Sequence, residues 1–244
     1  MNGRILKFVA AAAFGSASMF AGIIPLGTTV SISNVTGSLT PYQATVNNQV
    51  VNVICDDPYD TYISTGYTAL ETQVSQISNP VGGTSAQFLA QTMYGSIGTV
   101  AVATKLYDAI AFLAMKVVPG AGAANNDLQT AIWYLVNNDF LSNGRTPPPL
   151  DAGISPLSPL TSLSTVAQNW VSLAMSQTYS AGYGANVVIL TPECPNGTKT
   201  ACAAGANHSQ EFIVVTPEPR TYALFGMGLI LLSLGTFRRR RSKG

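Results

Sequence analysis

The 244-residue chain is 47% apolar and only 9% charged, and its formal net charge is +1. Most of its basic residues lie near the two ends, which leaves four basic side chains against ten acidic ones between residues 22 and 217. This composition excludes a basic surface for nucleic acid, and it provides enough apolar material for one folded core rather than a disordered chain.

The first 21 residues have the pattern of a secretory signal peptide. Arg4 and Lys7 form a basic n-region, and the small, apolar run Phe8–Phe20 forms the h-region. This run is too short to cross a bilayer stably. We therefore predict export, with a mature N-terminus between residues 19 and 30. The alternative is an N-terminal anchor that is never cleaved.

Residues 22–215 are predicted to form one exported α+β domain. The first part, residues 28–54, is rich in Val, Thr and Ser with alternating apolar positions, which is typical of strands joined by turns. Helical spacing of Ala, Leu and Met follows, and apolar strands return before the C-terminus. The predicted helices lie in residues 65–79, 84–118, 126–138 (capped by Asn125 or Asn126) and 163–175, and the predicted last strands are residues 186–190 and 211–215.

Residues 216–244 have three parts, and the first is the triplet Pro217, Glu218 and Pro219. An apolar run of sixteen residues, 222–237, follows, and after it come Arg238, Arg239, Arg240 and Arg241. Such a run spans roughly 24 Å as a helix, slightly less than a bilayer core of roughly 30 Å. Because arginines stay on the cytoplasmic side, we predict a short transmembrane helix that leaves the preceding domain outside.

This C-terminal segment closely resembles the PEP-CTERM sorting signal, over about 28 residues. The resemblance implies that the chain is exported by the general secretion machinery and then recognised by an exosortase, a membrane-embedded cysteine transpeptidase. It further implies processing near the Pro-Glu-Pro motif and release or attachment at the cell surface. The alternative is an ordinary tail anchor that is never processed.

The chain has three cysteines, an odd number for an exported protein. Cys194 and Cys202 flank a seven-residue loop that contains Pro, Asn and Gly, so we predict that they form a local disulfide. Cys55 is then left for an intermolecular bond or for another role.

Cys55 ends the apolar run Val53–Cys55, and much later the chain reads Leu-Gln-Thr-Ala-Ile-Trp over Leu128–Trp133. These two segments resemble the paired motifs of the thioester domains of bacterial surface adhesins. In that family a Cys is joined to the Gln of a Thr-Gln-x-Ala-(Ile/Val)-Trp motif, and Leu128 departs from it where the family has Thr. The family also has a Gln within an apolar run, for which Gln87 is the counterpart here.

The thioester resemblance implies that Cys55 supplies the sulfur and Gln129 the acyl group. A thiolate held against a desolvated carboxamide can displace ammonia and store the acyl group, provided that water is excluded. A lysine amine on a partner would then be acylated and trapped covalently. Trp133, one helical turn beyond Gln129, is expected to shield the bond.

Several alternatives remain open for these residues. Cys55 could pair with Cys194 or Cys202 or be an inert buried thiol, with Gln129 and Trp133 as ordinary helix-core residues. The three acids Asp56, Asp57 and Asp60 could hold Ca²⁺ or form a solvated turn, although their spacing fits no EF-hand. No cofactor is expected, and the one histidine, His208, lacks the companions of a zinc site or a serine triad.

The leading functional hypothesis is a cell-surface or extracellular-matrix protein that adheres or binds rather than catalyses, with surface amines or exopolysaccharide as partners. Its sharper form is covalent adhesion through a thioester between Cys55 and Gln129. The competing hypotheses are an exported hydrolase that acts on exopolysaccharide or peptide, and a passive component of a biofilm matrix.

Overall fold

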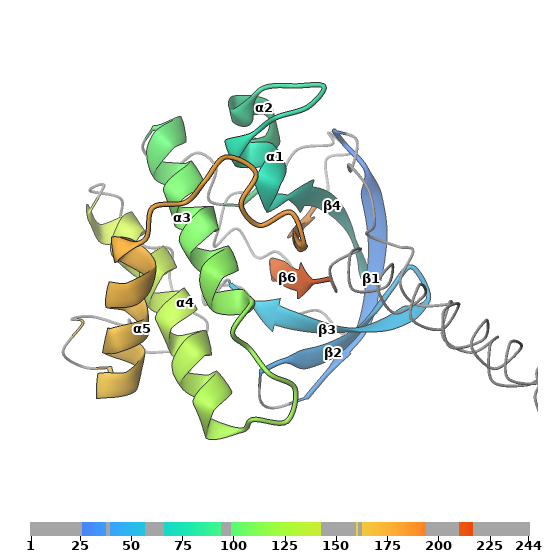
Figure 1. The fold of residues 1–244 in the computed structure, drawn as a ribbon. Helices are drawn as coiled ribbons and strands as arrows, with labels where there is room; N and C mark the ends of the chain where they lie inside the picture. The colour runs from blue at the N-terminus through green and yellow to red at the C-terminus, as the bar shows by residue number, and fades with distance from the viewer. Residues whose placement is uncertain are drawn as a thin grey trace, which may run out of the picture. The chain divides into compact units, whose positions relative to one another are not determined.

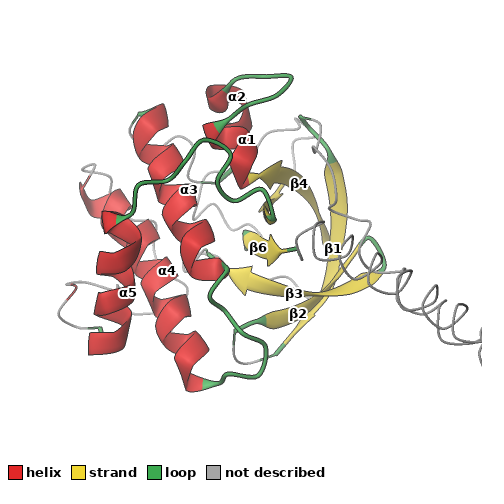
Figure 2. Cartoon of the chain, in the orientation of Figure 1, coloured by secondary structure: helices red, strands yellow, loops and turns green. Residues whose placement is uncertain are grey.

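The computed structural model describes residues 26–37, 40–56, 66–93, 99–142, 160, 163–193 and 210–216, with the side chains of residues 137–142 left out. Residues 22–215 form one compact unit of the chain. Within this unit the fold is α+β, as predicted, and its two parts are a strand region and a helical region (Figures 1 and 2).

The strands form a closed, fully antiparallel barrel in the order β1-β2-β3-β6-β5-β4. Closure satisfies the backbone groups that an edge strand would expose. All the described helices come between β4 and β5 in the chain, so the two strands that complete the barrel follow the helices. The strands are β1 (Thr29–Thr36), β2 (Tyr42–Val46), β3 (Gln49–Cys55), β4 (Tyr67–Gln73), β5 (Val187–Pro192) and β6 (Phe212–Val215).

The helices pack on one side of the barrel (Figure 1). Three of them begin at hydroxyl caps, because Thr84, Thr99 and Ser164 each accept a hydrogen bond from a backbone N–H three residues later. The helices are α1 (Val74–Ser78), α2 (Ser85–Leu89), α3 (Val100–Ala114), α4 (Ala123–Ser142) and α5 (Thr165–Ser176).

The prediction for residues 65–79 is wrong over its first half, because residues 67–73 form strand β4 rather than a helix. This segment pairs with β1 on one side and with β5 on the other, and most of it is buried. Tertiary pairing and burial of both faces outweigh the helical propensity of Ala, Leu, Glu and Gln. Within residues 65–79, only the segment that forms α1 is helical as predicted.

The predicted N-terminal cap of the helix over residues 126–138 is also wrong. Helix α4 starts at Ala123, so Asn125 lies inside it, and its side chain is directed to other segments of the chain. The predicted helix over 84–118 is divided between α2 and α3, and α3 ends at Ala114, before Pro119. The predicted helix over 163–175 and the two last predicted strands are confirmed within a few residues.

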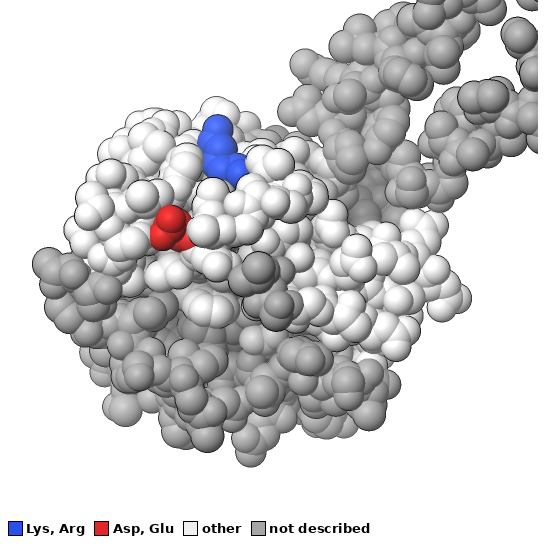
Figure 3. Space-filling view, turned by 90° about the horizontal axis from the view of Figure 1, so that it is seen from below, with Lys and Arg blue, Asp and Glu red and all other residues white. Residues whose placement is uncertain are grey.

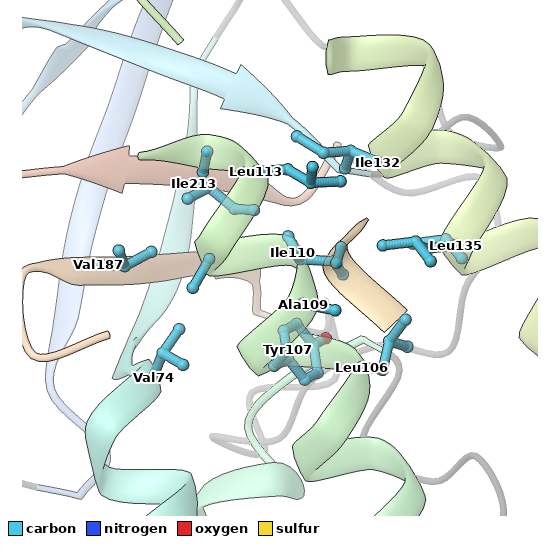
Figure 4. Close-up of a cluster of buried hydrophobic side chains, with 14 of the residues drawn as sticks. Val74, Leu106, Tyr107, Ala109, Ile110, Leu113, Ile132, Leu135, Val187 and Ile213 are labelled. Atoms are coloured by element: carbon cyan, nitrogen blue, oxygen red, sulfur yellow. The ribbon is translucent and has the colours of Figure 1, made fainter. Parts of the chain in front are cut away.

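All residues of β5 are buried, and two of them, Val187 and Ile189, belong to the apolar core that the helices share with the barrel. Side chains alternate along a strand, so Val187 and Ile189 face the helices, whereas Val188 and Leu190 face the barrel interior. The helix-side core joins Ile213 of β6 to Leu113 of α3 and Ile132 of α4 (Figure 4).

Among the described residues, no helix combines the length and apolar character needed to cross a membrane. The predicted span 222–237 lies outside the described residues, as do the predicted signal peptide and the Pro217-Glu218-Pro219 motif.

Candidate functional site

Cys55 is the last residue of β3 and is fully buried as a thiol. It is held in register opposite Phe212 of β6, while Ile54 lies opposite Ile213. Because Ile54 belongs to the helix-side core, the alternation of side chains turns Cys55 toward the barrel interior. Cys194 and Cys202 lie outside the described residues, so the alternative pairings of Cys55 stay predictions.

Gln129 of α4 is also buried, with 4% of its surface exposed. Its carboxamide nitrogen donates a hydrogen bond to the backbone carbonyl of Cys55. Its carboxamide oxygen accepts one from the hydroxyl of Thr40, over 2.5 Å. The structure therefore brings the two predicted residues into direct contact and fixes the Gln129 side chain at both ends of its amide.

Asn125, one turn before Gln129 on α4, holds the loop that supplies Thr40. Its side-chain nitrogen donates to the carbonyl of Thr40 over 3.0 Å and to the carbonyl of Val118 over 2.7 Å. Its side-chain oxygen accepts from the backbone N–H of Val118 over 3.1 Å. Residues four apart lie on one helical face, so Asn125 and Gln129 together anchor this loop to α4.

This arrangement has a clear chemical consequence for the carboxamide of Gln129. The Thr40 hydroxyl donates to the amide oxygen, the atom that gains negative charge when a nucleophile attacks the amide carbon. Both Gln129 and Cys55 are removed from solvent, which strengthens such an interaction and limits hydrolysis. The geometry therefore polarises a buried carboxamide that contacts the backbone of a buried cysteine.

Two further residues of the predicted motif have different positions. Trp133 follows Gln129 by one turn of α4 and is partly buried, and its indole nitrogen is buried with no acceptor among the described residues. Gln87, the predicted counterpart of the family's second Gln, instead caps α2. Its side-chain oxygen accepts from the Thr84 N–H over 2.7 Å, so it has a local structural role.

Two fully buried acids flank the pairing of β3 with β6: Asp56 directly follows Cys55, and Glu211 directly precedes Phe212. Glu211 accepts hydrogen bonds from the backbone N–H of Met93 and the Tyr107 hydroxyl, each over 2.8 Å, and from the Thr191 hydroxyl.

Asp56 is fully buried, so it is not available to a surface calcium site or to a solvated acidic turn, as these two hypotheses require. Within the ranges that the structure describes, no cluster of three or more potential metal ligands is present. The remaining predicted site residues lie outside these ranges, namely Asp57, Asp60, Cys194, Cys202, His208 and the C-terminal arginines.

Thr40, Glu211 and Tyr107 were not found by sequence reasoning. Thr40 lies in a short turn before Pro41, and nothing in the local sequence relates it to Gln129. Glu211 offers a faint signal, because it is a lone acid at the start of the apolar strand β6. Only the pairing of β6 with β3 and β5 shows that it is surrounded by hydrogen-bond donors.

No protein-family model matches the chain, and comparisons with curated proteins and with solved structures yield no significant match.

Proposed function

We propose that this chain is an exported protein of the cell surface or extracellular matrix, whose folded unit adheres covalently through a thioester between Cys55 and Gln129. The observation that carries the proposal is the buried contact of the Gln129 carboxamide with the Cys55 carbonyl. The sequence motifs identified both Cys55 and Gln129. The two residues are far apart in the sequence, but in the fold the side-chain amide of Gln129 contacts the backbone carbonyl of Cys55.

The proposed bond forms by attack of the Cys55 sulfur on the side-chain carbonyl carbon of Gln129. The carbon–sulfur bond forms, the carbon–nitrogen bond breaks, and the thiol proton is balanced by the proton that the leaving nitrogen takes up as ammonia. Thr40 supports this step because its hydroxyl donates to the oxygen that becomes negative.

The thioester would then act on an amine presented by a partner, such as a lysine side chain. The amine nitrogen attacks the same carbon of Gln129, the carbon–sulfur bond breaks, and Cys55 regains a thiol with the proton lost by the amine. The product is an amide bond between the two molecules. Burial of both residues supports the storage role, because water that cannot reach the acyl group cannot hydrolyse it.

The surface of the unit supports adhesion that does not depend on strong charge. Charged side chains are sparse on the face in Figure 3, and Lys105 and Lys116 are the only basic residues that the structure describes. Such a surface offers no broad electrostatic attraction for a polyanion. The proposed location outside the cell rests on the terminal sequences, with an exosortase and the secretion machinery as the expected processing partners.

The test is the intact mass of the protein purified from cells that express the full chain, before and after treatment with methylamine. We expect a native mass short by one ammonia, which rises by one methylamine on treatment. Cys55→Ala should abolish both changes. Gln91→Ala is the matched control, because Gln91 is another buried glutamine that lies away from Cys55 in the sequence and hydrogen-bonds Thr72.

Two outcomes would contradict the covalent mechanism. One is a wild-type mass equal to that of the processed sequence, with no uptake of methylamine. The other is uptake that survives in Cys55→Ala. Either result would leave noncovalent adhesion or a passive matrix role, and turnover on a panel of polysaccharides would then favour the exported hydrolase instead.

A further inference from the structure

A chain of hydrogen bonds runs from Asn125 through Thr40 to Gln129. The Asn125 side chain donates to the Thr40 carbonyl over 3.0 Å, and the Thr40 hydroxyl donates to the Gln129 carboxamide oxygen over 2.5 Å. All three residues are buried, with 1%, 4% and 4% of their surfaces exposed in this order. Thr40 is therefore the hydrogen-bonding link between the Asn125 side chain and the carboxamide of the proposed thioester.

Strand pairing does not set the position of Thr40. The pairing of β2 with β3 starts at Tyr42 and the pairing of β2 with β1 starts at Gln43, so Thr40 lies before both registers. A buried backbone carbonyl outside a ladder needs another donor. Asn125 supplies this donor, and it thereby ties the Thr40 backbone to helix α4.

The Asn125 side chain is itself held at its other contacts. Its nitrogen donates a second hydrogen bond to the Val118 carbonyl over 2.7 Å, and its oxygen accepts one from the Val118 N–H over 3.1 Å. Both N–H donors of the amide and one of its acceptor positions are thus in use. The clasp on Val118 fixes the plane of the amide, so the remaining N–H stays directed at the Thr40 carbonyl.

The position of the Thr40 hydroxyl matters for the proposed chemistry at Gln129. The oxygen that accepts from Thr40 gains negative charge when the thioester forms, and it gains charge again when an amine attacks the thioester. A donor stabilises this charge only at hydrogen-bond distance, and a displacement of about 1 Å can lower a rate by about 100-fold. The rate is therefore sensitive to the group that holds Thr40 in place.

We propose that Asn125 is a positioning residue for the thioester between Cys55 and Gln129, an inference that rests on the proposed function. Asn125 holds the Thr40 backbone, and it thereby keeps the Thr40 hydroxyl on the carbonyl oxygen of the acyl group. It exchanges no proton and forms no covalent bond in either step. Asn125 contributes to the rate only while the Thr40 hydroxyl is present.

The experiment measures the rate of methylamine uptake by intact mass, with protein purified from cells that express the full chain. With methylamine in excess the uptake is first-order, so its rate does not depend on the fraction of a variant that carries the thioester. We expect Asn125→Ala to lower this rate by about 10-fold. Thr40→Val removes the donor itself and should lower it by about 100-fold.

Asn126→Ala is the matched control for Asn125→Ala. It makes the same chemical change at the next residue of α4, where the side chain is exposed. Its rate of methylamine uptake should equal that of the wild type. A loss in the control as large as in Asn125→Ala would overturn the inference, because any Asn on this turn of the helix would then have the same effect.

A double-mutant cycle separates positioning through Thr40 from a general loss of structure. In the Thr40→Val background, Asn125→Ala should change the rate by less than about twofold, because no hydroxyl remains to be positioned. In the Thr40→Ser background, which keeps the hydroxyl, the loss should again be about 10-fold. A merely structural role of Asn125 would lower the rate equally in all three backgrounds.

Asn125→Asp is a second variant for the case that Asn125→Ala does not fold. It keeps the size of the side chain and the acceptor for the Val118 N–H, but it replaces the amide nitrogen that donates to Thr40. It should lower the rate to a similar extent. For variants without any thioester, the fraction of modified chains is compared instead, and a bond that forms in Thr40→Val but not in folded Asn125 variants would overturn the inference.

The remaining outcomes distinguish the inference from the function on which it rests. A folded Asn125→Ala protein that takes up methylamine at the wild-type rate would overturn the positioning role alone. A 10-fold loss that persists in the Thr40→Val background would do the same, because Asn125 would then act by another route. A wild-type protein with no thioester would overturn the positioning role and the proposed function together.

Discussion

Asp108 lies on helix α3 and Glu211 is hydrogen-bonded to it through Tyr107, but the surroundings of these two buried acids differ. Glu211 has donors to both carboxylate oxygens, from the backbone of Met93 and from the Tyr107 and Thr191 hydroxyls. Asp108 has a buried oxygen, Oδ1, without a hydrogen-bond partner among the described residues. Burial alone raises the pKa of Asp108 to about 7.

The comparison teaches that burial of an acid does not by itself indicate a function. A buried carboxyl group without donors costs free energy and favours its neutral form. A buried carboxylate with several fixed donors keeps its charge in a defined place, where it can exchange protons with neighbours. Glu211 has several fixed donors, and they offset in part the burial that raises its pKa above the usual value.

The largest effect is expected from removal of the Glu211 carboxylate. Glu211→Ala leaves the Met93 N–H and the Tyr107 and Thr191 hydroxyls without their acceptor in a closed environment. We expect the free energy of unfolding to fall by about 3 kcal/mol or more. Denaturant unfolding of the full protein measures it, and a loss below about 1 kcal/mol would show that the network is not integral to the fold.

A smaller effect is expected when one donor is removed. Tyr107→Phe keeps the ring in the core but deletes a hydrogen bond to the fully buried carboxyl group of Glu211, and it should lower the unfolding free energy by about 2 kcal/mol. Tyr179→Phe is the comparison variant, because the Tyr179 hydroxyl donates to the neutral carbonyl of Ala174 over 2.6 Å. Tyr179→Phe should lower the unfolding free energy by about 1 kcal/mol. Equal losses in the two variants would show that the Tyr107 and Tyr179 hydrogen bonds stabilise the fold equally.

Removal of the Asp108 carboxylate should raise the free energy of unfolding instead of lowering it. Asp108→Asn removes a charge that lacks a hydrogen bond at Oδ1, so the variant should be more stable than the wild type at about pH 8, by about 1 kcal/mol. At about pH 4 the wild-type carboxyl is already neutral, and the difference should vanish. Thermal unfolding at the two pH values checks this, and a destabilised variant at alkaline pH would contradict it.

The stability of the wild-type protein should also depend on pH. Burial raises the pKa of Glu71 from 4.5 to about 7, and that of Asp108 from 3.8 to about 7. Between these limits the folded protein binds more protons than the unfolded chain, so the free energy of unfolding falls as pH rises and levels off above about pH 7. Midpoints of thermal unfolding that rise over this interval would contradict the assignment.

Elements of the fold could be predicted where the local sequence pattern favours the same secondary structure that the element adopts in the folded unit. Helix α5 and strands β5 and β6 lie close to the predicted ranges, because each has one dominant periodicity and clear ends. Strand β4 was assigned to a helix, because its residues suit a helix and only pairing with β1 and β5 makes them a strand. The closure of the barrel could not be predicted, since it depends on contacts between distant segments.

Some residues of the candidate site could likewise be predicted from the sequence, and others could not. The motifs around Cys55 and Gln129 drew attention to these two residues, and the fold brings them into contact. Asn125 was expected to cap a helix, but its side chain instead holds the Thr40 loop, because α4 begins before it. Thr40 could not be linked to Gln129 from sequence, because the two residues meet only when the barrel packs against α4.

The sequence by itself determined the α+β class of the folded unit and the identity of the residue pair, because periodicity and motif spacing are local properties of a chain. It also carries the terminal patterns on which the predicted export rests. Only the tertiary structure decided that Tyr107 and Thr191 donate to Glu211, and that Thr40 and Gln129 share a hydrogen bond. Strand register and helix packing set these contacts, and both are fixed by the burial of side chains from the whole unit rather than by any single segment.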